Sequence, residues 1–332
     1  MRRFYGGLLT AVLILSNVSA AQAAITLYSE DFETDPAANW TTNSSGLSDI
    51  LVDFHYDYSA IGVPNAPGGA TSRGLKMTAN NSGGVFSGFS VSPTGKSFTG
   101  SYTVSFNLWQ NYVGPLNVGG SGTTQLSSYG IGTTGTSANW PGAAGQQYVG
   151  FMHTLDGGSS VDYRVYTSTA TSGATPTTDG VSYTAGTHAT ARNGSDPHYS
   201  GFGGEAAPAA QLALYPGQTD VTAAGVAAFA WRNVVIDVVE NIPNNTKIAT
   251  WTIDGLQIAQ VDLTKMTLAG DNIFFGHSDS NNPSSTDPNR TNLNVTLIDN
   301  IRVTAVPEPS ALSLGLFGAA LTLVGRRRKL AN

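Results

Sequence analysis

Short stretches in which polar and apolar residues alternate limit the fold of this chain more than any other feature. Residues 101–109 alternate with a period of two, and residues 161–166 do so more weakly. A period of two places successive side chains on opposite faces of a β-strand, one of them buried. No convincing amphipathic helix accompanies these stretches. The sequence therefore predicts an all-β protein.

Further strands are expected at residues 148–152, 231–239, 271–276 and 294–303. The stretch 231–239 is apolar enough to lie at the centre of a sheet. Residues 248–253 and 256–261 flank the pair Asp254-Gly255, which strongly favours a tight turn between two paired strands. Many short strands separated by turn residues are typical of a sandwich or a barrel.

Composition excludes several classes of site. The chain has no cysteine, so a disulfide framework, a thiolate zinc site and a cysteine nucleophile are excluded. Only 11% of its residues are charged, and it contains 39 glycines, which suits an extracellular β-rich protein with many turns. The net charge of −6 includes basic clusters at both ends, so the remainder is more acidic than the whole. Because no basic stripe is visible, no nucleic-acid partner is expected.

The middle of the chain differs from the rest. Residues 113–225 are rich in Gly, Ala, Ser and Thr and contain few large apolar side chains. A second domain would need apolar residues for its own core, so this stretch is expected to form long loops on a single domain. No convincing internal repeat occurs. We therefore expect one domain over residues 24–305.

The N-terminus has the composition of an export signal. Two arginines are followed by an apolar run at residues 8–15 and by small residues that include Ala21 and Ala23. This order is typical of a secretory signal peptide, expected over residues 1–23, with cleavage between Ala23 and Ala24. A buried core helix is the alternative. The residues around the paired arginines match a twin-arginine signal poorly, which favours ordinary export.

The C-terminus has three parts. The motif Val306-Pro307-Glu308-Pro309 is followed by an apolar stretch, 311–325, and a basic cluster, 326–329. About 20 residues are needed to span a bilayer, so 15 indicate a marginal and transient anchor. The basic cluster should stay in the cytoplasm, which places residues 24–305 on the far side of the membrane.

These three parts, over residues 306–330, resemble the PEP-CTERM sorting domain of Gram-negative bacteria. The resemblance implies processing near the Pro-Glu-Pro motif by an exosortase, after export across the inner membrane. It also implies a final location at the cell surface or in the extracellular matrix, and an association with exopolysaccharide and biofilm. It assigns no activity to residues 24–305.

Residues 24–305 resemble the concanavalin A-like or laminin-G-like jelly roll. The resemblance rests on residues 29–33 before Trp40, on the strand-turn-strand stretch 251–259 and on the final strand, 298–303. It implies a jelly-roll β-sandwich, flanked by a cleavable N-terminal signal helix and a C-terminal hydrophobic helix.

Two groups of oxygen-bearing side chains are candidates for a structural Ca²⁺ site. Asp31 or Glu33 near the first strand could pair with Asp299 on the last strand, because terminal strands of sugar-binding jelly rolls often lie side by side and share a calcium. The loop 278–289 is also rich in Asp, Asn and Ser, although it does not match an EF-hand. The alternatives are ordinary strand-edge polarity and turn-forming residues.

Sugar binding requires an aromatic face together with amide and carboxylate groups. Trp109, Gln110, Asn111 and Tyr112, at a predicted strand end, are the preferred patch. Tyr129, Trp140 and Tyr148 are further aromatic residues near amide side chains in the sequence. The alternative is that Trp109 belongs to the core and Tyr112 anchors a loop.

No pattern of catalytic residues is found. The Glu-x-Asp-x-x-Glu strand of laminarinase-like hydrolases is absent, and residues 24–305 contain only four glutamates. No Gly-x-Ser-x-Gly stretch accompanies the five histidines. We therefore expect a non-catalytic surface protein that contacts polysaccharide. The alternatives are a glycoside hydrolase or lyase of unfamiliar pattern, and a structural matrix protein without a defined ligand.

Overall fold

The computed structural model describes residues 24–44, 49–81, 87–111, 125–140, 147–155, 161–167, 180–187, 192–219, 221–279 and 288–306. The expected signal peptide and residues 307–330 of the sorting segment lie outside these ranges, as do Tyr112 and most of the oxygen-rich loop 278–289.

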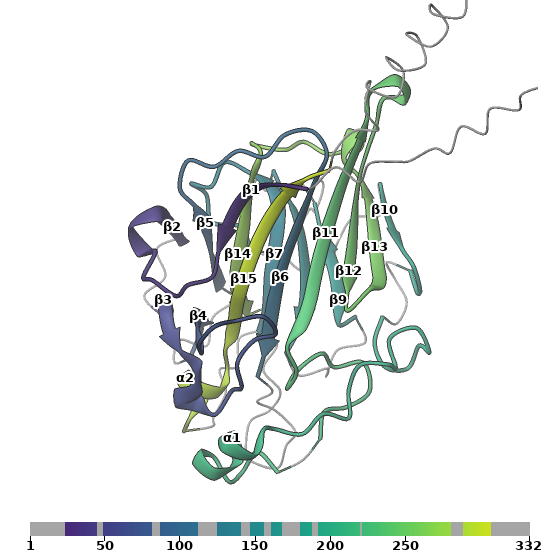
Figure 1. Cartoon of the computed structure of the whole chain (residues 1–332). Helices are drawn as coiled ribbons and strands as arrows, with labels where there is room; N and C mark the ends of the chain where they lie inside the picture. Colours follow the sequence, from purple (N-terminus) through teal and green to yellow (C-terminus); the bar gives the residue numbers. More distant parts are fainter. Residues whose placement is uncertain are drawn as a thin grey trace, which may run out of the picture.

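Two antiparallel sheets pack face to face (Figure 1). Sheet A has nine strands: in order, β10 (Val181–Tyr183), β13 (Leu256–Asp262), β12 (Thr246–Ile253), β11 (Arg232–Asn241), β6 (Tyr102–Gln110), β15 (Thr296–Ala305), β4 (Arg73–Ala79) and β3 (Ile50–Asp57), with β1 (Ile25–Glu30) also paired to β15. Sheet B has six strands: β2 (Trp40–Ser44), β5 (Ser87–Pro93), β14 (Asn272–Asp279), β7 (Gln125–Thr133), β8 (Val149–Thr154) and β9 (Tyr163–Tyr166). The predicted all-β sandwich is confirmed.

The helical elements are short. They are the 3-10 turns η1 (Ala37–Asn39), η2 (Tyr58–Ile61), η3 (Ile242–Asn244) and η4 (Leu263–Lys265), and the helices α1 (Ala209–Leu214) and α2 (Arg290–Leu293). Within the described ranges, no helix has the length and apolar character needed to cross a membrane.

The expected strands are confirmed, within a few residues, as β6, β8, β9, β11, β14 and β15. The predicted central strand is β11, which lies between β12 and β6. Asp254 and Gly255 form the tight turn between β12 and β13, and both have positive φ, at 50° and 78°. A turn with two positive φ values matches the twist of paired strands, which explains why the Asp-Gly pair predicts it.

The main core fills the space between the sheets and is rich in aromatic side chains. The rings of Phe106 and Tyr129 meet edge to face with centroids 4.9 Å apart, and Phe106 meets Phe275 at 5.0 Å. The Trp251 indole donates to the Tyr129 hydroxyl at 3.0 Å. Because Phe106 and Trp251 lie on sheet A and Tyr129 and Phe275 on sheet B, these contacts join the sheets directly.

A long irregular segment, residues 192–231, closes one end of the sandwich (Figure 1). Its residues Ala207, Val226, Ala228 and Phe229 join a second apolar cluster with residues of η2 and β15. This segment therefore packs onto the sandwich through η2 and β15, whereas the expectation of a single domain over residues 24–305 stays a prediction. The opposite end carries the two ends of the described chain, because β1 pairs with β15 and Ile25 lies opposite Ala305.

Candidate functional site

The three carboxylates predicted to bind calcium lie in one region, but each bonds to a different group. Asp299 Oδ2 accepts a hydrogen bond from the Tyr58 hydroxyl at 3.0 Å. Glu33 accepts two bonds from Thr71, from its amide at 2.9 Å and its hydroxyl at 2.8 Å. Asp31 accepts the amide of Glu33 at 3.2 Å. Neutral donors therefore occupy oxygen atoms of all three carboxylates.

The charge around Asp299 is unusual. Burial raises the pKa of Asp299 to about 7; hydrogen bonds from Asn300 and Tyr58 oppose this shift, and the negative charges of Glu33 and Asp31 add to it. Within the described residues, no three His, Cys, Asp or Glu side chains converge as metal ligands. The residues present do not form a calcium cage, and calcium binding at Asp31, Glu33 and Asp299 stays a prediction.

The predicted sugar-binding patch is divided between two faces of sheet A. Trp109 points to the outer face, where it is buried beside Trp231 with ring centroids 5.8 Å apart. Gln110 points between the sheets, where its amide donates to Ser127 at 2.9 Å. Asn111 is also buried and accepts bonds from the Trp109 indole at 3.1 Å and from Gln211 at 3.0 Å. With its ring covered, Trp109 presents no face to a sugar in this conformation, and sugar binding by these residues stays a prediction.

A different group of aromatic side chains lies on the outer face of sheet B, the face turned away from sheet A. Phe274, on β14, alternates with core residues and so points outward. Tyr148, just before β8, meets it edge to face with centroids 5.1 Å apart. Trp140, on the connection between β7 and β8, is also buried. We call these three residues the aromatic layer.

Glycines in the strands below make room for the aromatic layer. A Cβ on Gly130 would lie 2.6 Å from the Phe274 ring, and one on Gly150 would lie 2.8 Å from the Tyr148 ring. A Cβ on Gly88 would likewise lie 2.9 Å from the Cβ of Trp140. Each distance is too short for real atoms, so the rings can rest on the backbone only because these positions are glycine.

Small hydroxyl side chains surround the aromatic layer. Ser92, Ser128 and Ser278 occupy outward positions on β5, β7 and β14, and all three are fully buried. Their hydroxyl groups, and that of Tyr148, have no hydrogen-bond partner within the described structure. A buried polar group without a partner costs about 1–3 kcal/mol, so four on one face call for an explanation.

The connection that follows β7 crosses this face as a strap, residues 134–140. The Asn43 side chain on β2 donates to the Gly135 carbonyl at 3.0 Å. The Ser90 hydroxyl on β5 accepts the Asn139 amide at 2.9 Å and donates to the Ser137 carbonyl at 3.4 Å. Three side-chain hydrogen bonds therefore hold this strap against the sheet.

A continuous chain of hydrogen bonds reaches the end of the same sheet. The Gln125 amide nitrogen donates to Asp279 at 3.4 Å, so its oxygen accepts from His277 Nε2. His277 Nδ1 then accepts from Thr296 at 2.9 Å, and Thr296 accepts from Ser127 at 2.6 Å. Burial lowers the pKa of His277 to about 3, so the ring is neutral, as this direction requires.

The chain ends at the buried carboxylate of Asp279, on the last residue of β14. The Asn80 amide, which follows β4, also donates to this carboxylate. His153 lies nearby on β8 and is fully buried, which lowers its pKa to about 3. Both of its ring nitrogens lack a partner in the described structure. This end of sheet B is therefore polar inside as well as outside.

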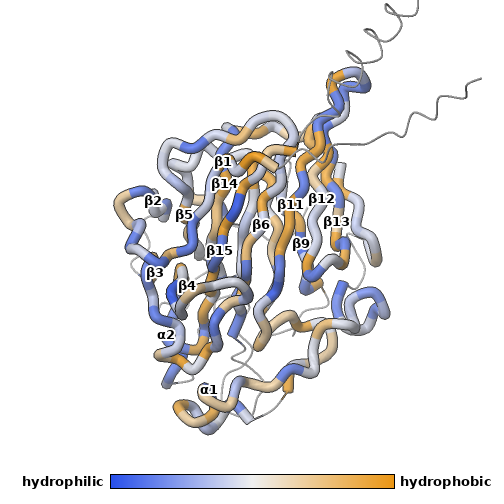
Figure 2. The backbone as a smooth tube through the Cα atoms, viewed as in Figure 1, coloured by the Kyte–Doolittle hydropathy of each residue, from blue (hydrophilic) through white to orange (hydrophobic). Residues whose placement is uncertain are grey.

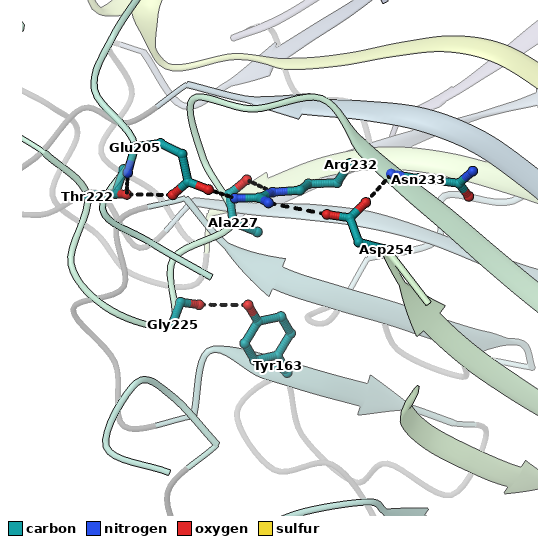
Figure 3. A network of polar contacts seen from close by, with 8 residues as sticks. All are labelled: Tyr163, Glu205, Thr222, Gly225, Ala227, Arg232, Asn233 and Asp254. Carbon is teal, nitrogen blue, oxygen red and sulfur yellow. Dashed lines mark hydrogen bonds and ion pairs between the residues drawn. The ribbon is translucent and has the colours of Figure 1, made fainter. Parts of the chain in front are cut away.

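A separate ionic network fixes the irregular segment 192–231 to the sheets (Figure 3). The buried Arg232 guanidinium bonds to Glu205, to Asp254 at 3.2 Å and to the Ala227 carbonyl at 3.0 Å. The Tyr163 hydroxyl of sheet B donates to the Gly225 carbonyl at 2.6 Å. Because all three guanidinium nitrogens of Arg232 bond to other protein groups, this network is structural.

Within the described strands of sheet B, no outward position carries an Asp or Glu, although Asp162, directly before β9, accepts a hydrogen bond from the outward Thr154 at 2.9 Å. Across the described strands these positions hold Thr, Asn, Ser, Gly and apolar side chains, with Arg164 and Tyr166 on β9, and no Asp or Glu. Glu30 lies on β1 and Glu240 on β11, both in sheet A, while Glu33 and Glu205 are engaged as described above.

Comparison with known proteins gives only distant structural likenesses. No protein-family model matches the chain, and no curated protein sequence matches it. A protein of unknown function with a galectin-like fold from Bacillus subtilis has a TM-score of 0.44 and 8% identity over 85% of this chain and 96% of its own. The Emp47p carbohydrate recognition domain has a TM-score of 0.41 and 10% identity over 84% and 96%. An endo-1,3-beta-glucanase from Streptomyces sioyaensis has a TM-score of 0.42 and 11% identity over 88% and 100%.

Sequence reasoning found two of the three residues of the aromatic layer but did not bring them together. Trp140 and Tyr148 are among the aromatic candidates, and Phe274 is predicted only as part of a strand. The signal that could have found the site is glycine inside predicted strands, because Gly130 and Gly150 mark close approach of another group.

Proposed function

We propose that the protein is a non-catalytic carbohydrate-binding β-sandwich of the concanavalin A-like jelly-roll type. The proposed site is the outer face of sheet B beneath the strap, bounded by the aromatic layer. The alternation of buried aromatic rings with unpartnered hydroxyl groups on this face is the observation that supports the proposal.

Both halves of that arrangement match the chemistry of a sugar. A pyranose ring has an apolar face of C–H groups that stacks on an aromatic ring, and a rim of hydroxyl groups that donate and accept hydrogen bonds. The Ser92, Ser128, Ser278 and Tyr148 hydroxyls could exchange bonds with such a rim, which would remove the cost of leaving them unpaired. The absence of charged groups along most of the face favours a neutral saccharide.

Entry of a ligand requires the strap to move. The hydrogen bonds from Asn43 and Ser90 to its backbone are bonds that sugar hydroxyls could replace. A glycan chain would then lie where residues 134–139 of the strap lie, with Trp140 staying over Gly88 at the end of the strap. An Asn43→Ala substitution, which frees the strap at one point, should therefore strengthen binding.

We further propose that the protein is exported, held briefly at the membrane by residues 311–325 and released to the cell surface or matrix by an exosortase. The end motifs described above support this proposal. Mass spectrometry of the protein recovered from cells tests it. We expect an N-terminus at Ala24 and a C-terminus close to Pro309, and recovery of intact residues 311–325 would contradict it.

Affinity gel electrophoresis tests the binding site. The exported protein is run through gels that contain a neutral β-glucan, xylan or mannan, and its retardation is compared with that of Trp140→Ala. We expect wild type to be retarded by at least one polysaccharide and Trp140→Ala to lose most of that retardation. Trp231→Ala serves as the control, because Trp231 is a half-buried indole directly before β11 that packs beside Trp109 on the outer face of sheet A. The site is wrong if Trp140→Ala folds and binds like wild type.

The same gels separate the alternatives. Release of reducing ends from the retarding polysaccharide would show a catalytic protein and overturn the non-catalytic proposal. Migration unaffected by every polysaccharide would favour a structural matrix protein.

A further inference from the structure

Exposed apolar side chains gather at the end of the sandwich that carries both ends of the described chain. Eight large apolar side chains are prominently exposed in the described ranges, and five of them lie at this end: Ile25, Leu27, Val239, Ile242 and Val306. Scattered exposed apolar residues are ordinary, but five at one end of a sandwich indicate a contact surface.

Backbone contacts show that these residues belong to neighbouring strands. Ile25 lies opposite Ala305 on β15. The Ser101 carbonyl accepts the Val306 amide at 3.0 Å, and the Ser101 hydroxyl accepts the Glu240 amide at 3.0 Å. Val239 and Ile242 flank Glu240 in the sequence. The five side chains thus lie at one end of sheet A, where β1, β15 and β11 begin or end.

The turn between β11 and β12 projects beyond this edge (Figure 1). Pairing of β11 with β6 stops at Val238 and Tyr102, whereas its pairing with β12 continues to Asn241 and Thr246. Three further residues at about 3.3 Å each extend the hairpin by about 10 Å. Ile242, at the tip, is 72% exposed, the highest value among these apolar residues.

Two lysines, Lys247 on β12 and Lys265 at the end of η4, lie near the projecting tip, which Figure 2 colours as largely hydrophilic. Lys247 pairs with Glu240 at 3.2 Å. A hollow of about 200 Å³ lies between the tip and η4, which ends at Lys265. Acidic residues such as Asp262 balance these charges, so the apolar contact is the decisive feature. A tip that exposes one isoleucine among asparagines and is flanked by long cationic side chains suits the headgroup region of a bilayer.

The sequence beyond β15 fixes the distance to a membrane. Five residues, 306–310, separate the end of β15 from the apolar stretch 311–325. Five extended residues span at most about 18 Å, and the headgroup region on one side of a bilayer takes about 5–8 Å of that length. At most about 10–13 Å then separates the end of β15 from the headgroup region, and the hairpin projects by about 10 Å, enough to reach it.

We infer that the η3 hairpin tip rests in the headgroup region of the membrane that holds residues 311–325 before sorting. Ile242 enters the interface, and Val239, Val306, Ile25 and Leu27 face it. This inference depends on the proposed anchor and is independent of the proposed sugar site. It also fixes the orientation of the anchored protein, with the segment 192–231 pointing away from the bilayer.

The absence of cysteine allows a direct test. Full-length chains that carry Ile242→Cys, Leu214→Cys or Leu316→Cys are labelled with an environment-sensitive fluorophore and reconstituted into phosphatidylethanolamine–phosphatidylglycerol vesicles. Leu214 is the matched control, because it is 52% exposed on α1 at the opposite end. Leu316 reports whether the apolar stretch is inserted.

We expect the label at 242 to shift to the blue and to be quenched several-fold less by aqueous iodide than the label at 214. A lipid carrying a headgroup-depth quencher should quench the label at 242 and leave the label at 214 unchanged. Equal behaviour at 242 and 214, with 316 buried in the bilayer, would overturn the inference while leaving the anchor intact. An iodide-accessible label at 316 would overturn both, and neither outcome bears on polysaccharide binding.

Discussion

The two sheets bury their outer faces to different extents. On β11 of sheet A, the outward residues Asn233, Val235, Asp237 and Val239 are half-buried or exposed. On β14, β7, β8 and β9 of sheet B, every residue is buried. On β11, sheet A therefore shows the alternation expected when one face is exposed to solvent. Sheet B is covered on both faces.

This difference locates the candidate site. The outer face of sheet A is largely water-facing along β11, where Asn233 and Asp237 alternate with the partly exposed Val235 and Val239. The outer face of sheet B contains glycines under aromatic rings and hydroxyls without partners, which a simple packing layer would not require. Unpaired polar groups beneath the strap are the feature of this face that supports the ligand site proposed above.

Removal of an aromatic ring from sheet B should have the largest effect. We expect Phe274→Ala to lower the free energy of unfolding by about 3–5 kcal/mol, because it leaves a cavity over Gly130. The matched change on the outer face of sheet A, Val239→Ala, should cost less than about 0.5 kcal/mol. Urea denaturation followed by tryptophan fluorescence measures both. Equal costs would mean that the aromatic layer is not packed.

Addition of a single methyl group below the aromatic layer should have the next largest effect. In Gly130→Ala the new Cβ would lie 2.0 Å from the Val149 carbonyl oxygen and 2.6 Å from Phe274. We expect a loss of about 1–3 kcal/mol from overpacking. Gly255→Ala is the glycine control on sheet A, since nothing lies within 4 Å of its Cβ position and only its positive φ opposes the change. A smaller loss of stability for Gly130→Ala than for Gly255→Ala would contradict close packing of Phe274 on Gly130.

Asp299 of sheet A and the two buried histidines of sheet B should change the free energy of unfolding with pH in opposite directions. The raised pKa of Asp299, about 7, means that its protonated form stabilises the fold below the unfolded pKa near 3.8, and that this stability is lost as pH rises towards 7. The lowered pKa of His153 and His277, about 3, means that their neutral forms stabilise the fold above pH 6.5, and that this stability is lost as pH falls towards 3.

Substitution of Asp299 or His277 separates these two opposed contributions to the pH dependence of stability. In thermal unfolding between pH 4 and 7.5, Asp299→Asn should remove the loss of stability at rising pH. His277→Gln should weaken the loss at falling pH. If Asp299→Asn leaves the profile unchanged, the carboxyl of Asp299 titrates at its ordinary pKa in the folded protein.

The smallest loss of stability is expected from a serine. Ser128→Ala should not lower the free energy of unfolding and should raise it by up to about 1–3 kcal/mol, because it removes a buried hydroxyl that has no partner to lose. Thr103→Ala on sheet A, which loses a hydrogen bond to Asp237 at 2.5 Å, should cost about 1 kcal/mol. Ser128→Ala should nevertheless weaken polysaccharide retardation, and unchanged retardation would remove this hydroxyl from the site.

Local patterns predicted strands well and the site poorly. The alternation in residues 101–109 and the Asp254-Gly255 turn were sufficient for β6 and for the hairpin of β12 and β13, because both signals are short-range. The predicted sugar-binding patch, Trp109–Tyr112, consists of residues that are adjacent in the sequence. Neighbours on a strand point to opposite faces, so Trp109 and Gln110 could not share one surface.

The sequence alone determined an all-β chain, the place of its central strand and the composition of its two ends, because period-two alternation, turn chemistry and apolar runs are properties of adjacent residues. Only the tertiary structure decided which face of which sheet is covered. It brought Tyr148 and Phe274 into contact, placed Trp140 on the same face over glycines from three strands, and placed Asp299 near Glu33 and Asp31. The register between distant strands and the path of the strap set those contacts, and neither is encoded in a local pattern.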